Sequence, residues 1–201
     1  MPKKTNNQTK TESKRDLSPA IAVAVLGLVA ERGWAGFDFV DIADAMAEDE
    51  ATIYAHAADK AALMHLVFRY VDECVAKAIE GGIHPNMPVK ERLFEVMMAR
   101  FDVLQEYRDG FIAILGDLRR DLCGVVTALP HVGQSMSRML TLAGEEPHGP
   151  IGAARILGLM TIYLHTLKVW QEDESPDMGR VMATIDRDLD RAARLEGYIA
   201  K

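Results

Sequence analysis

Residues 29–63 read VAERGWAGFDFVDIADAMAEDEATIYAHAADKAAL. This segment runs from the end of one apolar helical pattern, through two short helical patterns, into the start of a longer one, which is the outline of a helix-turn-helix. No Lys or Arg lies between Arg32 and Lys60. Seven carboxylates occupy the same interval: Asp38, Asp41, Asp44, Glu48, Asp49, Glu50 and Asp59. The pattern predicts a helix-turn-helix, but its charge is opposite to that of most nucleic-acid-binding surfaces.

The 201-residue chain has a formal net charge of −7 that is unevenly distributed. Residues 1–15 contain five basic groups and one acidic group, whereas residues 16–59 contain one basic group and nine acidic groups. A protein that binds duplex DNA gains much of its affinity by neutralising phosphates and releasing counterions. Only the N-terminal tail has the sign of charge that such binding requires.

The composition, 49% hydrophobic and 26% charged residues, predicts an ordered, soluble, helix-rich protein. The polar N-terminus has no apolar stretch typical of a secretion signal. The most apolar segment, residues 151–170, contains Arg155, His165 and Lys168, so we expect a buried helix and no membrane-spanning segment. Cys74 and Cys123 lie far apart without CxxC spacing, which predicts buried, reduced thiols in a cytoplasmic protein.

Helical periodicity and turn residues divide the first half of the chain. Residues 1–16 are predicted to be a disordered basic tail, and residues 17–82 a helix-turn-helix domain with a connecting helix. Ser18 is expected to cap a first helix that Gly33 ends. Second and third helices are expected near residues 39–47 and 52–54. A fourth is expected to start at Asp59 and to end at the pair of glycines 81 and 82.

Residues 83–201 predict a larger helical domain, which begins with a proline-containing connection over residues 83–89. Helical patterns follow at residues 93–104, 109–118, 119–143, 151–170 and 175–195. No strand pattern appears, so the predicted class is all-α. The pattern over residues 151–170 is apolar nearly all round, and a second copy could cover it together with residues 175–195. We therefore expect a homodimer with a two-fold four-helix bundle.

Four fragments occur together at the spacing found in the tetracycline-repressor (TetR) family: VAERGW (29–34), DIADAM (41–46), TIY (52–54) and DKAAL (59–63). Over its first 80 residues the chain resembles this family of one-component transcriptional regulators. The resemblance implies a TetR-like fold and duplex DNA as a partner, with the third helix in the major groove. It implies DNA contacts at Thr52, Tyr54, His56 and Lys60. The basic tail, which includes Lys14 and Arg15, either follows a groove or is a solvated tail.

Six positions depart from the family pattern. Phe37 replaces a Thr, Val40 an Arg, Ala47 the turn glycine, Glu48 an apolar residue, Glu50 a Lys or Arg, and Ala57 a Phe. Missing cations and added carboxylates both lower the affinity expected for a duplex.

A second resemblance covers residues 163–195, YLHTLKVWQEDESPDMGRVMATIDRDLDRAARL. This stretch is similar to the lipid-binding accessory family of coenzyme Q biosynthesis, whose fold is TetR-like but which does not regulate genes. Trp170, Asp173, residues 175–177 and the Asp-Arg pairs near Asp186 and Asp190 carry the likeness. It implies an alternative function, in which the protein binds an isoprenoid or other lipid and assists a biosynthetic complex.

The TetR resemblance implies a small apolar ligand or lipid within the second domain. Methionines at helical spacing fit either an ordinary core or an irregular apolar cavity. The candidate ligand-binding residues are Met97, Phe101, Leu104, Tyr107, Phe111, Leu115, Met160 and Tyr163. The six histidines lack metal-ligand spacing, and no nucleophile, phosphate-binding or dinucleotide motif is present. We therefore expect no enzyme activity, no metal site and no cofactor.

Overall fold

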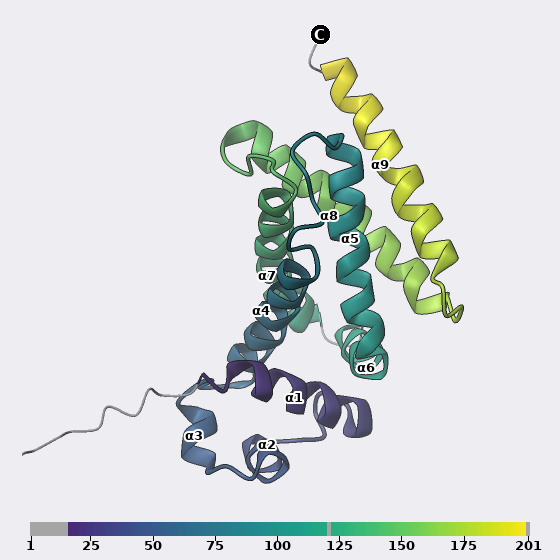
Figure 1. Cartoon of the computed structure of the whole chain (residues 1–201). Coiled ribbons are helices and arrows are strands. Elements are labelled where there is room, and N and C mark those ends of the chain that lie inside the picture. Colours follow the sequence, from purple (N-terminus) through teal and green to yellow (C-terminus); the bar gives the residue numbers. More distant parts are fainter. Residues whose placement is uncertain (1–15, 120–121, 200–201) are drawn as a thin grey trace, which may run out of the picture.

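The computed structural model describes residues 16–119 and 122–199, with the backbone alone at 122–125, 127 and 195–199. All regular secondary structure in these ranges is helical, which confirms the predicted all-α class (Figure 1). The helices are α1 (Ser18–Arg32), α2 (Phe39–Met46), α3 (Glu50–Tyr54), α4 (Lys60–Ala78), α5 (Val89–Glu106), α6 (Arg108–Leu118), α7 (Leu122–Leu142), α8 (Gly149–Glu172) and α9 (Gly179–Ile199). The sites predicted at Lys14 and Arg15, and the side chain of Cys123, lie outside the described residues.

Helices α1, α2 and α3 form a head that packs on the first half of α4 (Figure 1). Its buried core contains Ile21, Val25, Phe37, Ile42, Ile53 and Leu63. Gly33 ends α1 with a φ of 73°, which favours glycine, and the Asp59 carboxylate accepts the N–H of Ala62 at the start of α4. Both of these helix limits confirm the sequence-based expectation.

Three predicted helix starts are wrong. Ser18 lies inside α1 and Leu17 is the N-cap, since the Asp16 carboxylate accepts the N–H of Ser18 at 3.0 Å. Helix α9 begins at Gly179 instead of residue 175. The Asp173 carboxylate accepts the hydroxyl of Ser175 at 2.6 Å and the N–H of Arg180 at 3.2 Å, and it closes a turn there.

Helix α5 begins at Val89, before the predicted start at residue 93. Its first residues are polar or exposed, with Val89 and Glu91 both facing solvent. Of residues 89–92 only Val89 is apolar, so this first turn does not show the apolar spacing that predicted a helix from residue 93.

The second half of α4 packs against α5 and α7, and α8 and α9 complete the body, with α8 against α7 and α9 against α5 and α8 (Figure 1). The buried body core includes Val75, Met97, Phe101, Met136, Trp170 and Ile185. Helix α6 lies at the junction, where it packs against α1 of the head. None of the helices in the described ranges combines the length and the apolar character that crossing a membrane would need.

Candidate duplex-binding surface and ligand cavity

The predicted recognition helix α3 presents few free polar groups. Tyr54 is 48% exposed, but its ring stacks on Phe39 with centroids 4.3 Å apart. Thr52 is half-buried, and His56 Nδ1 donates to its carbonyl oxygen at 2.9 Å. Three of the predicted contact residues thus lie together at α3, although His56 is already engaged with the backbone.

Lys60, the fourth predicted contact, is directed toward the loop between α1 and α2. Its Nζ donates to the carbonyl oxygen of Trp34 at 2.6 Å and lies 4.3 Å from the centroid of the Phe37 ring. Burial lowers the pKa of Lys60, against the opposing effect of Asp38 and Asp41. A phosphate contact from this ammonium would have to replace the bond to Trp34.

Three of the seven carboxylates between Arg32 and Lys60 stabilise helix ends. Asp38 accepts the N–H groups of Val40 and Asp41. Asp41 in turn accepts the N–H of Asp38 and pairs with Arg32 Nη1 at 2.6 Å, and these hydrogen bonds lower the pKa of Asp41. Asp59 caps α4.

The other four carboxylates are exposed, and their side chains have no hydrogen-bond or ion-pair partner within the described part of the chain: Asp44, Glu48, Asp49 and Glu50. We call this set the acidic face. It extends from α2 through the turn to the first residue of α3, where a phosphate backbone would approach a helix-turn-helix.

The turn between α2 and α3 contains a strained residue. Ala47 has a φ of 53° and a ψ of 42°, which is the left-handed region. A non-glycine residue in this region is disfavoured by about 1–2 kcal/mol. The turn therefore holds an alanine in a conformation that favours the glycine expected at this position.

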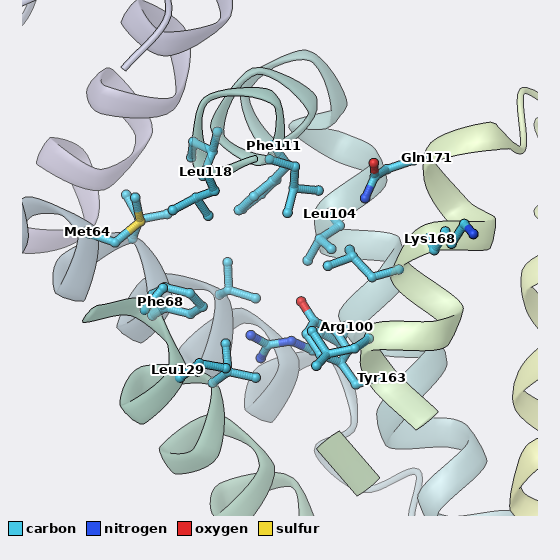
Figure 2. Close-up of a pocket in the computed structure, with 18 of the residues that line it drawn as sticks. Met64, Phe68, Arg100, Leu104, Phe111, Leu118, Leu129, Tyr163, Lys168 and Gln171 are labelled. Carbon is cyan, nitrogen blue, oxygen red and sulfur yellow. The ribbon is translucent and has the colours of Figure 1, made fainter. Parts of the chain in front are cut away.

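The body contains a cavity of about 290 Å³ whose walls come from α4, α5, α6, α7 and α8 (Figure 2). Four of the eight predicted ligand residues line it: Leu104, Phe111, Leu115 and Tyr163. Met97 and Phe101 are buried in the body core, and Met160 packs against that core. Tyr107 instead shares a hydrogen bond with Tyr70, with the two hydroxyl oxygens 2.8 Å apart.

Helix α4 forms a wall of the cavity that the sequence-based list omits. Met64, Val67, Phe68 and Val71 contribute it. The residues predicted from the sequence all belong to the second domain, whereas α4 extends from the head into the body. The spacing of Met64 and Phe68, one turn apart beside the apolar stripe of the head, is the signal that could have identified this wall.

Among the described residues that line the cavity, three have cationic side chains and none has a carboxylate: Arg100, Arg119 and Lys168. Arg100 is 1% exposed, and its Nη1 donates to Asp72 Oδ1 at 2.7 Å. Asp72 also accepts the Ser135 hydroxyl at 3.0 Å and pairs with Arg138 Nη1 at 2.9 Å. The buried Asp72 carboxylate therefore forms ion pairs with two guanidinium groups.

Helix α6 connects the cavity to the head. Ile114 lines the cavity and also belongs to the head core. A Cβ atom at Gly110 would lie 2.7 Å from the carbonyl oxygen of Leu26, so this contact with α1 requires a glycine. The Asp117 carboxylate accepts the N–H of Trp34 at 2.8 Å. A displacement of α6 would therefore be transmitted to α1 and to the loop that follows it.

A histidine pair joins α4 to α7 beside the cavity. The Nδ1 atoms of His65 and His131 lie 3.2 Å apart, so one ring must donate and the other accept. Burial and the charge of His131 lower the pKa of His65. Over residues 16–119 and 122–199, no cluster of three or more potential metal-ligating side chains forms.

No protein-family model and no curated protein matches the chain. Among solved structures, it is similar to the TetR transcriptional regulator from Nitrosomonas europaea ATCC 19718, with 22% identity and a TM-score of 0.69 over 88% of this chain and 98% of that one. A protein from Mesorhizobium loti MAFF303099 assigned to the TetR family matches with 15% identity and a TM-score of 0.53, over 87% and 93% of the two chains. These similarities confirm the TetR fold.

Proposed function

We propose that this protein is a one-component transcriptional regulator in which a small apolar ligand in the body controls duplex binding by the head. The position of α6 carries the proposal, because Ile114 belongs to the head core and lines the cavity. A ligand that fits one arrangement of α4 and α6 better than another shifts the population toward that arrangement. The contacts of Gly110 and Asp117 then pass the change to α1.

Dimer formation through α8 and α9 would turn this local change into a change in the separation of two heads. The two helices pack against each other, and on α8 Ile151 is 71% exposed and Leu157 is 59% exposed. A second copy placed around a two-fold axis would cover these side chains.

The dimer is tested at Leu157. Leu157→Asp should give a monomer by light scattering at micromolar concentration. Val126→Asp, at an exposed valine of α7, should leave the dimer intact. A wild-type monomer would contradict the bundle.

A second candidate function is favoured by the acidic face: a TetR-fold protein that binds a lipid or isoprenoid, without binding DNA, in the manner of the coenzyme Q accessory family. Four carboxylates that have no partner among the described residues would face the phosphates, and Lys60 is engaged with Trp34. The two candidates share the cavity and differ only in what the head does.

A duplex titration of the full-length protein over a range of salt concentrations separates the candidates. The duplexes are first selected from a random pool, so that no operator has to be known. A regulator should bind selected duplexes with a Kd of about 10⁻⁸ M or tighter near physiological salt, and log K should fall linearly with log salt. Binding no tighter than about 10⁻⁵ M for every duplex would remove the regulator proposal. A lipid extracted from the purified protein and identified by mass spectrometry would then support the second candidate.

A further inference from the structure

The charged groups around the cavity differ in their exposure. Arg119 and Lys168 are exposed, as are the apolar residues Leu129 and Leu164, so these four mark the open side of the cavity. Arg100 is almost completely buried, and Figure 2 shows it next to Tyr163, across the cavity from Phe111 and Leu118. The cavity therefore has a buried cation on one side and exposed cations at its opening.

The buried cation shares its countercharge and keeps one unsatisfied donor. Asp72 carries one negative charge, and it pairs with both Arg100 and Arg138, so the cluster has an excess of one positive charge. The Nε atom of Arg100 is buried and has no hydrogen-bond partner among the described residues. A buried guanidinium is costly unless its charge and its donors are satisfied. An anion beside Arg100 would provide both a countercharge and an acceptor.

The remaining wall is apolar and sets the size of the occupant. Side chains such as Val67, Leu104, Val132 and Leu167 leave about 290 Å³. At ~30 Å³ per water-sized group, this space holds about ten non-hydrogen atoms. An apolar chain of that length would contact the wall without leaving polar atoms unpaired.

We infer that the cavity binds an amphipathic anion: an apolar chain of about ten non-hydrogen atoms that ends in a carboxylate paired with Arg100. This inference rests on the proposed role of the cavity as a ligand site. It specifies the chemistry of the ligand, and it excludes neutral isoprenoids and lipophilic cations as the preferred class. Arg100 would then hold two partners, with Nη1 on Asp72 and Nε on the ligand.

Calorimetry with three probes of equal chain length tests the inference on the wild-type protein. Decanoate should bind at least about tenfold more tightly than decanol, because a hydrogen bond to a charged group is stronger than one to a neutral group. Decyltrimethylammonium should bind most weakly. Equal affinity for decanoate and decanol, or tighter binding of the ammonium, would overturn the inference while leaving the cavity as a ligand site. If none of the three binds, the ligand-control part of the proposed function fails as well, whatever the duplex titration shows.

Two variants locate the anion. Arg100→Met should remove the preference for decanoate over decanol, whereas Arg138→Met should reduce decanoate affinity by less than about threefold. The latter removes a guanidinium from the same carboxylate, but this side chain is half exposed and lies outside the cavity. Should Arg100→Met fail to fold, Arg100→Lys keeps the charge but lacks Nε and should lower the preference severalfold. A preference that survives these changes and is lost in Lys168→Met would place the anion at the opening and overturn the assignment to Arg100.

Discussion

The acidic face of the head and the cavity of the body carry opposite charges, and they relate differently to folding. Within residues 16–119 and 122–199, the acidic face has four exposed carboxylates without partners, whereas the residues that line the cavity include three cations and no carboxylate. Exposed charges contribute little to stability, so the contact surface can change while the caps and core of the helix-turn-helix persist. A buried charge has no such freedom. Arg100 pairs with the Asp72 carboxylate on α4, and the Ser135 hydroxyl on α7 donates to the same carboxylate.

The largest expected effect is the loss of stability on changing Asp72, the buried partner of Arg100. Asp72→Asn removes the carboxylate shared by Arg100 and Arg138, and it should lower the free energy of unfolding by about 3–5 kcal/mol, because it leaves a buried guanidinium without a countercharge. Urea denaturation measures this loss. The control Asp190→Asn breaks one of the two solvent-exposed ion pairs of Lys90 and should leave the urea midpoint nearly unchanged. Similar losses for both variants would show that burial does not distinguish the two sites.

Replacing Glu48 and Asp49 with Ser and Glu50 with Lys tests the acidic face. The triple variant should bind duplex DNA at least about tenfold more tightly at 0.1 M salt, because it removes repulsion and adds a counterion-releasing contact. Fluorescence anisotropy with a labelled duplex provides the measurement. The control changes net charge equally but far from the head: Glu80→Ser, Glu91→Ser and Glu95→Lys. An equal gain in the control would mean that net charge, and not the acidic face, limits binding.

The strained turn next to the acidic face gives a smaller effect. Ala47→Gly should stabilise the protein by about 1 kcal/mol, since the left-handed conformation suits glycine. In the control Ala45→Gly, at an exposed helical position of α2, stability should fall by about 0.5–1 kcal/mol. Thermal denaturation distinguishes the two signs. Destabilisation by Ala47→Gly would show that the turn is not strained.

The smallest expected effect concerns the histidine pair beside the cavity. Burial and the charge of His131 lower the pKa of His65 below its ordinary value near 6.5. As the pH falls, His65 is therefore protonated at a higher pH in the unfolded chain than in the folded one. The stabilisation is complete above about pH 6.5 and is lost as the pH falls toward the folded-state pKa. His65→Gln should therefore reduce the loss of stability between about pH 7.5 and 5.5 by less than about 1 kcal/mol, because the ring is partly solvated. His84→Gln, at an exposed histidine, should leave it unchanged.

Local patterns in the sequence were sufficient for most of the fold. The apolar spacing of Ile21, Val25 and Leu28 and the end at Gly33 predicted α1, and the Asp59 cap predicted the start of α4. The start predicted at residue 175 was wrong because the Asp173 carboxylate accepts the Ser175 hydroxyl and the N–H of Arg180, and so holds residues 173–178 in a turn that the Ser-Pro pattern does not reveal. Half of the predicted cavity residues line the cavity. The wall that the sequence did not predict belongs to α4, which contributes to the cores of both the head and the body.

The sequence by itself determined the all-α class, the helix-turn-helix outline and the concentration of negative charge in the head, because helical period, caps and charge depend on residues near one another. Only the tertiary structure decided that Lys60 turns toward Trp34, that Asp72 on α4 meets Arg100 of α5, and that α6 joins the cavity to the head. The physical reason is that periodicity shows which face of a helix is buried, whereas the neighbour that covers this face is set by the packing of distant segments.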